Sequence, residues 1–132
     1  MIGRLDRSLR REIGALVSPF GLTVAKYTAL SILRDRPGLS NAQMARRSLV
    51  TPQSMNEVLA ALEADGLVAR SPAANHGRVV ELALSERGVE VLEACDRAVT
   101  HMENAMLADL GEAERAALRE ALLGCVHRLG PR

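Results

Sequence analysis

Aromatic side chains are almost absent from this sequence, whose 132 residues include one Phe, one Tyr and no Trp. Proteins that bind single-stranded DNA or RNA stack bases on several aromatic rings, so this composition disfavours that class. No apolar run approaches the ~18 residues that a membrane span needs. The first stretch, MIGRLDRSLRREIG, lacks the apolar segment of a signal peptide. We therefore expect a cytoplasmic protein that does not bind membranes.

Residues that could form a catalytic or metal site are also scarce. The two cysteines, Cys95 and Cys125, lack the spacing of metal ligands, and we expect reduced, buried thiols rather than a redox or cross-linking role. The histidines His76, His101 and His127 do not lie near a plausible nucleophile or acid pair in the sequence. The sequence therefore predicts no enzymatic activity, no catalytic residues, no metal and no cofactor.

Charge is distributed unevenly along the chain, although the net charge is only +1. Residues 34–56 contain four arginines and one acid, a net +3, whereas residues 81–120 contain ten acids and four arginines, a net −6. A basic half beside an acidic half is typical of a protein that presents one face to a polyanion. The alternative is that these charges only solvate helix faces.

Apolar spacing predicts a mostly α-helical chain. In the first segment, apolar residues recur every three or four positions, as in an amphipathic helix that ends near Pro19; they are Ile2, Leu5, Leu9, Ile13, Leu16 and Phe20. Thr23 is expected to cap a second helix that stops before the turn at Arg36-Pro37-Gly38.

Two capped helices then follow in close succession. Ser40 and Gln43 have the spacing of a capping box, and the short helix that they open is expected to contain Met44 and Ala45 and could extend to Leu49. Thr51 and Pro52 open the next helix as N-cap and first helical residue, and Gly66 ends it. Two short helices joined by a tight turn form a helix-turn-helix, whose second helix contacts bases.

The rest of the chain is predicted to form a β-hairpin and two helices. Residues 67–70 and 78–84 have strand character, and the small polar stretch 71–77 is expected to be the loop. A long helix is expected from Ser85 to about Asp109, and a last one from Glu112 to about Leu129. The long helix carries two apolar stripes, Val89, Leu92, Val99, Met106 and Val91, Cys95, Ala98, Met102. One stripe can pack on its own domain and the other on a second copy of the chain, unless both serve one small core.

Polar side chains at the start of the 51–65 helix are suited to contact DNA. Amide groups bond in pairs to adenine N6 and N7, and free backbone amides at helix starts attract phosphate. The expected base contacts are Gln53, Ser54 and Asn56, opposite Met55, Val58, Leu59 and Leu62; the expected phosphate contacts are Ser40, Arg46, Arg47 and Thr51. The alternative is that these residues only solvate the helix start.

Three stretches resemble the winged helix-turn-helix regulators of the MarR (multiple antibiotic resistance) type. They are GLTVAKYTALSIL, PGLSNAQMARRSLVTPQSMNEVLAALEADGLVAR and GRVVELALSERGVEVL, which together extend nearly continuously over residues 21–92. The length of 132 residues predicts a single domain, 1–132, and the resemblance implies that it is mostly α with a small β-hairpin. Within it, a DNA-binding lobe at 23–84 is flanked by dimerisation helices at 1–20 and 85–129.

The resemblance also implies a function and its residues. Such regulators are homodimers that bind a palindromic operator in double-stranded DNA as repressors or, less often, activators. The reading elements here would be the helix 51–65 and a wing at 71–78, with Arg78 as the wing arginine in the minor groove. Many relatives release DNA on binding a small, often aromatic, effector. Candidate lining residues for an effector are Leu9, Ile13, Tyr27, Leu30 and Met44, which core packing explains equally well.

Two departures from the family pattern leave an alternative open. The family commonly has an acid two residues before the wing arginine, where this chain has His76, which we interpret as an exposed loop histidine rather than a phosphate contact. Glu57 stands where the family often has a basic or polar residue; it could accept a hydrogen bond from cytosine N4 or pair with a nearby arginine. The alternative function is a winged-helix module for protein–protein contact with little or no DNA binding.

Overall fold

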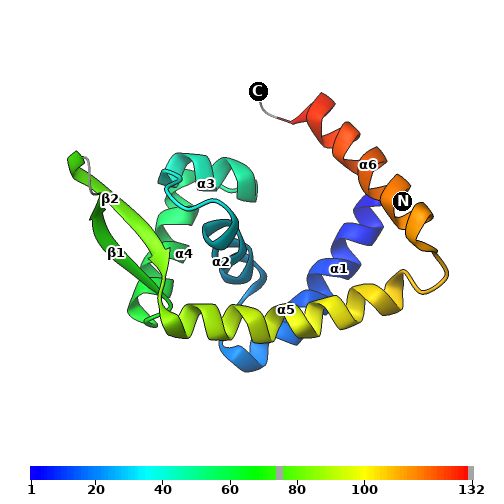
Figure 1. The fold of residues 1–132 in the computed structure, drawn as a ribbon, viewed down its shortest axis with the longest axis horizontal. Coiled ribbons are helices and arrows are strands. Elements are labelled where there is room, and N and C mark those ends of the chain that lie inside the picture. Colours follow the sequence, from blue (N-terminus) through cyan, green and yellow to red (C-terminus); the bar gives the residue numbers. More distant parts are fainter. Residues whose placement is uncertain (74–75, 131–132) are drawn as a thin grey trace. The chain divides into compact units, whose positions relative to one another are not determined.

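The computed structural model describes the backbone of residues 1–73 and 76–130, and their side chains outside residues 71–80. Contacts between backbone positions divide the chain into two compact units, Met1–Ala98 and Val99–Arg132. The elements in chain order (Figure 1) are α1 (Ile2–Val17), η1 (Ser18–Phe20), α2 (Val24–Asp35), α3 (Asn41–Ser48), α4 (Pro52–Ala64), β1 (Val68–Ala73), β2 (His76–Leu84), α5 (Glu86–Met106) and α6 (Glu112–Leu129). The mostly helical fold with one small hairpin is confirmed.

The helix starts of the first unit are capped by the predicted side chains. Thr23 Oγ1 accepts a hydrogen bond from the backbone N–H of Lys26 at 3.2 Å, at the start of α2. At the start of α3, the Gln43 N–H donates to Ser40 Oγ at 3.2 Å and the Ser40 N–H donates to Gln43 Oε1 at 2.8 Å, which is a complete capping box. These caps set where each helix begins.

The turn between α3 and α4 begins one residue earlier than the sequence predicts. α3 ends at Ser48, and Leu49 adopts a left-handed backbone with φ of 56°, so it does not extend the helix. A left-handed conformation is costly for a residue with a Cβ, and here the C-terminal hydrogen bonds from the Leu49 N–H to Ala45 and Arg46 accompany it. The Leu49 side chain consequently points to solvent and is 78% exposed.

The hairpin strands are longer than predicted, which corrects the expected loop of residues 71–77. β1 and β2 pair antiparallel from Val68 opposite Leu84 outward, and the strand backbone continues through Ser71–Ala73 and resumes at His76. A register shift occurs between Pro72 and Ala73. A proline suggests a loop because it donates no hydrogen bond, but each strand of a two-stranded sheet has a free edge where proline is tolerated.

The start of α5 is hydrogen-bonded to the junction between α4 and β1. Ser85 Oγ donates to the Gly66 carbonyl at 2.6 Å and accepts from the Gly88 N–H at 3.0 Å, while the Ser85 N–H donates to the Leu67 carbonyl at 3.0 Å. Gly66, with φ of 74°, ends α4 as predicted. The hairpin therefore begins and ends at one hydrogen-bonded cluster. α5 ends at Met106, three residues before the predicted end.

A single buried seam runs along α5 within one copy of the chain. Its buried residues recur at spacings of four, three and four; they are Gly88, Leu92, Cys95 and Val99. Leu92 and Val99 come from one predicted stripe and Cys95 from the other. Val89 and Met106 are exposed, and burial of the remaining apolar residues of α5 by a second copy of the chain stays a prediction.

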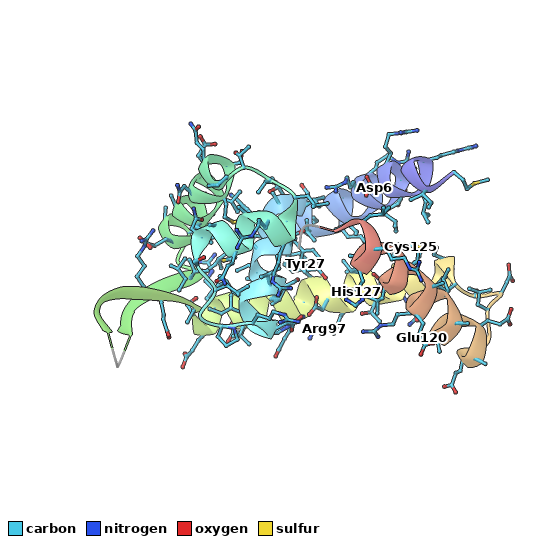
Figure 2. The ribbon with its side chains drawn as sticks, turned by 90° about the horizontal axis from the view of Figure 1, so that it is seen from above. Asp6, Tyr27, Arg97, Glu120, Cys125 and His127 are labelled. Carbon is cyan, nitrogen blue, oxygen red and sulfur yellow. The ribbon has the colours of Figure 1, made fainter. Side chains whose placement is uncertain are left out.

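The second unit contains α6, most of whose side chains are exposed. Exposed apolar residues occur from the second turn to the end of α6: Leu118, Leu122, Leu123, Val126 and Leu129. Cys125 also lies on α6 and is exposed (Figure 2), which corrects the expectation of a buried thiol there. Cys95 is buried, and both thiols are free.

Within the described part of the chain, no single helix is long and apolar enough to span a membrane. The pair Ile2–Phe20 and Val24–Asp35 meets that length and composition only when the two helices, bent by 82°, are taken together.

Candidate nucleic-acid interface

α3 and α4 are in contact and form the predicted helix-turn-helix (Figure 1). The Asn41 Nδ2 group at the start of α3 donates to the Pro52 carbonyl at the start of α4 at 3.2 Å. Asn41 therefore ties the two helix starts together. Ser40 and Thr51, the N-caps of these helices, are both exposed. Two capped helix starts with positive dipole ends are thus presented on the surface of the lobe.

One face of α4 is buried and the opposite face is free of packing. Met55, Leu59 and Leu62 are buried against the lobe. The opposite side carries exposed residues at spacings of three and four, which we name the outward face: Gln53, Asn56, Glu57, Ala60 and Ala64. Two amides and one carboxylate therefore share the first turns of this face, and small alanine side chains follow them.

The polar side chains of the outward face have no partner within the described part of the chain. Gln53, Asn56 and Glu57 make no side-chain hydrogen bond or ion pair there, which removes the predicted alternative of a Glu57–arginine pair among these residues. Elsewhere in the same unit, Arg10 and Arg70 pair with acids. The outward face thus leaves its hydrogen-bonding groups available.

The two predicted phosphate-binding arginines are available in the same way. Arg46 and Arg47 lie in the last turn of α3 and are exposed. Neither makes an ion pair with a described acid. In contrast, Arg70 Nε lies 2.5 Å from Glu63 Oε2 at the far end of α4. Two unneutralised positive charges therefore stand beside the helix-turn-helix.

Ser54 and Thr51 differ from the other predicted contacts because they bond to each other. Thr51 Oγ1 accepts from the Ser54 N–H at 3.1 Å, and the two hydroxyl oxygens are 3.0 Å apart. Ser54 lies beside the outward face rather than within it, one turn before the half-buried Val58. The Thr51 hydroxyl is thus engaged in the helix cap. Thr51 and Ser54 are both exposed, and their contacts with DNA stay predictions.

The predicted wing arginine falls partly outside what the structure describes. The backbone of Arg78 belongs to β2, but its side chain, like that of His76, lies outside the described residues. The role of Arg78 therefore stays a prediction.

The five candidate effector-lining residues divide into two groups. Leu30 and Met44 are fully buried in the core. Leu9, Ile13 and Tyr27 are half-buried on α1 and α2, two helices that are in contact. A depression of about 280 Å³ on the first unit is lined by none of these five; its lining residues are Thr28, Ser31, Ile32, Asp35, Arg36 and Arg47.

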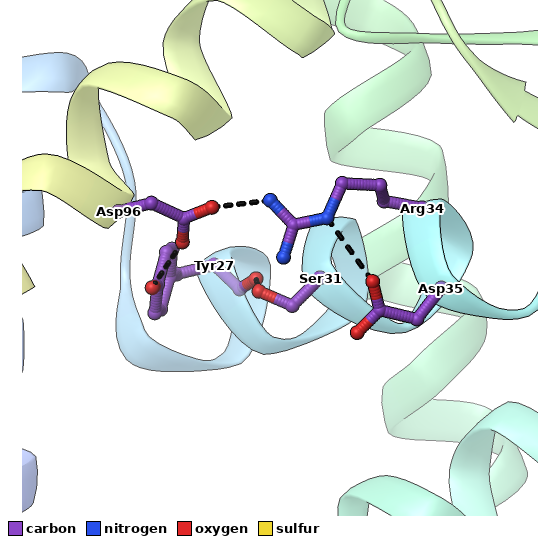
Figure 3. A network of polar contacts seen from close by, with 5 residues as sticks. All are labelled: Tyr27, Ser31, Arg34, Asp35 and Asp96. Carbon is purple, nitrogen blue, oxygen red and sulfur yellow. Dashed lines mark hydrogen bonds and ion pairs between the residues drawn. The ribbon is translucent and has the colours of Figure 1, made fainter. Parts of the chain in front are cut away.

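A polar network joins α2 to α5 beside Tyr27 (Figure 3). Tyr27 Oη donates to Asp96 Oδ1 at 2.6 Å, and the other oxygen of Asp96 accepts from Arg34. The Arg34 guanidinium also contacts Asp35 at 3.1 Å. The hydrogen bond to Asp96 raises the pKa of Arg34, so the guanidinium stays charged. Sequence reasoning missed this network because its members are 62 and 69 residues apart.

Among the described residues, no group of three His, Cys, Asp or Glu side chains could hold a metal ion.

Comparison with known proteins identifies the family. Residues 20–79 match the model of the MarR family. The HTH-type transcriptional repressor Rv2887 of Mycobacterium tuberculosis is 35% identical over 122 residues, which cover 92% of this chain and 88% of the repressor. The crystal structure of the M. tuberculosis MarR family protein Rv2887 with salicylic acid has a TM-score of 0.78 at 35% identity, covering 94% of this chain and 92% of that one.

The structure of the same M. tuberculosis protein in complex with DNA is also similar. Its TM-score is 0.73 at 33% identity, and the match covers 94% of this chain and 93% of that chain. The similarity extends over the helix-turn-helix, the hairpin and the flanking helices alike. With this identity along nearly its whole length, the chain belongs to the MarR family of transcriptional regulators.

Proposed function

We propose that this chain is a homodimeric transcriptional repressor that binds a palindromic operator in double-stranded DNA. The observation that carries the proposal is the outward face of α4, whose amides and carboxylate have no partner among the described residues. Exposed amides and carboxylates that are not engaged within the fold are free to bond the donors and acceptors that base edges present in the major groove. The second helix of a helix-turn-helix lies in the major groove.

The neighbouring charges fit the same ligand. Arg46 and Arg47 are exposed and unpaired within the described residues, which suits phosphate neutralisation. Ser40 and Thr51 stand at helix starts, where anions are stabilised. We infer that Arg78 on the hairpin enters the minor groove, where a narrow width concentrates negative potential. The M. tuberculosis relative has been solved in complex with DNA.

Exposed apolar side chains support a homodimer. α1 exposes Ile2 and Leu5, and α6 exposes five large apolar residues from Leu118 to Leu129. Removing apolar surface from water gains roughly 25 cal/mol per Å², so such helices favour association with a second copy. We infer that residues 1–20 and 85–129 form the dimer interface, and that the lobe at 23–84 is presented twice to a two-fold symmetric site.

A small aromatic acid is the effector that we propose. The M. tuberculosis relative has been solved with salicylic acid and with p-aminosalicylic acid. In this chain, the half-buried Leu9, Ile13 and Tyr27 could line an aromatic ligand, whereas Leu30 and Met44 are fully buried. Binding releases DNA only if the effector prefers the geometry that does not bind DNA.

We expect neither catalysis nor membrane attachment, and we expect the protein in the cytoplasm with its DNA. The competing function is a protein-contact module with the same fold. Salt titration of duplex binding separates the two. DNA binding through arginines weakens steeply as salt rises, with a slope set by the number of phosphates contacted. Failure to bind any duplex at low salt would favour the protein-contact module.

A further inference from the structure

We propose that Glu57 determines operator specificity by accepting a hydrogen bond from the N4 amino group of a cytosine in the major groove. The inference rests on the proposed function, because it requires α4 to lie in that groove. Glu57 is negatively charged, so it cannot bind phosphate. On a surface that faces DNA, the role left to it is recognition of a base.

Glu57 lies on the outward face of α4. It follows Gln53 by four residues, so the two side chains are one turn apart on the same side of the helix. Ala60 comes three residues later and is exposed, and its methyl group leaves space for close approach of the helix to the bases. Glu57 is exposed itself and lies opposite the buried Met55 and Leu59.

No described residue forms an ion pair with Glu57, so its negative charge is not neutralised within the described part of the chain. Glu63, on the same helix, is paired with Arg70. A free carboxylate near DNA is repelled by every phosphate. An acid at this position therefore lowers affinity for DNA in general, and only a base contact can offset that loss at particular sequences.

The chemistry of the carboxylate selects the base. An ionised carboxylate only accepts hydrogen bonds, so it requires a donor on a base edge. In the major groove, cytosine N4 and adenine N6 are the donors, but adenine presents its N7 acceptor beside N6. The N7 lone pair repels a carboxylate, whereas the C5 hydrogen beside cytosine N4 does not. Cytosine is therefore the base that fits Glu57.

Replacing the carboxylate by an amide reverses this preference. Glu57→Gln keeps the shape of the side chain but adds an N–H donor beside the remaining acceptor. Such an amide bonds in pairs to adenine N6 and N7. The substitution is thus expected to change the preferred base from cytosine to adenine at one position in each half-site, and to raise affinity for unrelated duplexes, since the repulsion from phosphate is lost.

The experiment is selection of bound duplexes from a random pool, with the wild-type chain, E57Q, E57A and the control E63Q. Glu63→Gln makes the same chemical change on the same helix, at a carboxylate that already pairs with Arg70 near the far end of α4, and thermal melts establish that each variant folds. We expect cytosine at one position per half-site for wild type and E63Q, adenine there for E57Q, and no preference there for E57A. At that position, the ratio of cytosine to adenine should differ between wild type and E57Q by at least about fivefold. This factor corresponds to the weakest of the specific contacts between a side chain and a base.

The outcomes separate this inference from the proposed function. If wild type and E57Q select the same base at every position of a shared palindrome, the role of Glu57 is overturned and the proposed function stands. If the wild-type chain selects no duplex at all, both are overturned.

Discussion

Gly88 on α5 lies so close to Leu67 that a Cβ on the glycine would stand 2.0 Å from the Leu67 carbonyl oxygen. No side chain fits at that distance, and the obstacle is backbone, which cannot rotate away. The same carbonyl accepts the hydrogen bond from the Ser85 N–H at 3.0 Å. The contact therefore requires glycine and holds the start of α5 against the junction between α4 and the hairpin.

Replacing Gly88 with Ala should destabilise the protein, although alanine is the better helix former. Inserting a methyl group into a packed contact costs about 1–3 kcal/mol, and here the Leu67 carbonyl must also move away from Ser85. The matched control is Gly124→Ala on α6, where no described atom of the same chain lies within 4 Å of the added Cβ and helix propensity predicts a gain of about 0.5–1 kcal/mol. Urea unfolding measures both; equal midpoints would contradict the role of Gly88.

The Tyr27–Asp96 hydrogen bond should contribute to the attachment of α2 to α5. Tyr27→Phe keeps the ring and removes the hydroxyl that donates to Asp96 at 2.6 Å. Loss of a hydrogen bond to a charged group costs about 1.5–3 kcal/mol, and the partly exposed site places the expected value at the lower end. The free energy of unfolding should fall accordingly. An unchanged free energy would mean that water replaces the hydroxyl at no cost.

Local patterns in the sequence were sufficient to predict the elements that depend on neighbouring residues. Thr23, Ser40 and Thr51 cap their helices as expected, because a cap involves residues only three positions apart. The outward face of α4 followed from helical periodicity. The grouping of its free side chains, however, could be recognised only once the ion pairs of the rest of the unit were known.

Features that depend on distant residues were not predictable. The network of Tyr27, Arg34 and Asp96 joins positions that no spacing rule connects. The burial of Cys95 and the exposure of Cys125 depend on which helix faces meet, and no local spacing of residues decides that. The extended strands around Pro72 depend on a free sheet edge, which a one-dimensional pattern does not reveal.

Cys95 should resist thiol reagents in the folded protein. Its side chain is 0% exposed, and burial, together with the nearby Asp96 charge, raises its pKa, so the reactive thiolate is disfavoured. In a Cys125→Ser variant, the remaining thiol should react with dithiobis-nitrobenzoate only after addition of denaturant. Rapid modification of that variant under native conditions would contradict the burial.

The raised pKa of Cys95 also makes stability depend on pH in one direction. Above the ordinary thiol pKa of about 8.5, the unfolded chain releases the proton while the folded chain retains it. The free energy of unfolding should therefore fall as the pH rises above about 8.5, and fall less in a Cys95→Ala variant. Identical pH profiles for the two proteins would exclude this contribution.

Arg46 and Arg47 should contribute affinity for DNA without sequence preference. Each lost phosphate contact should lower the salt slope of binding by about 0.9 and weaken binding to all duplexes alike. The control is Arg97→Ala, which removes an exposed arginine from the acidic segment of α5 (Figure 2). Fluorescence anisotropy with a labelled duplex measures the slopes. Slopes equal to those of the control would show that these arginines do not contact DNA.

The most direct test of the dimeric DNA-binding function is sedimentation of the purified chain with duplexes selected from a random pool. We predict a two-fold symmetric consensus and a complex of two chains on each duplex, assembled at micromolar concentration or below and dissociated by salt. A chain that sediments as a monomer beside unbound DNA at low salt would contradict that prediction.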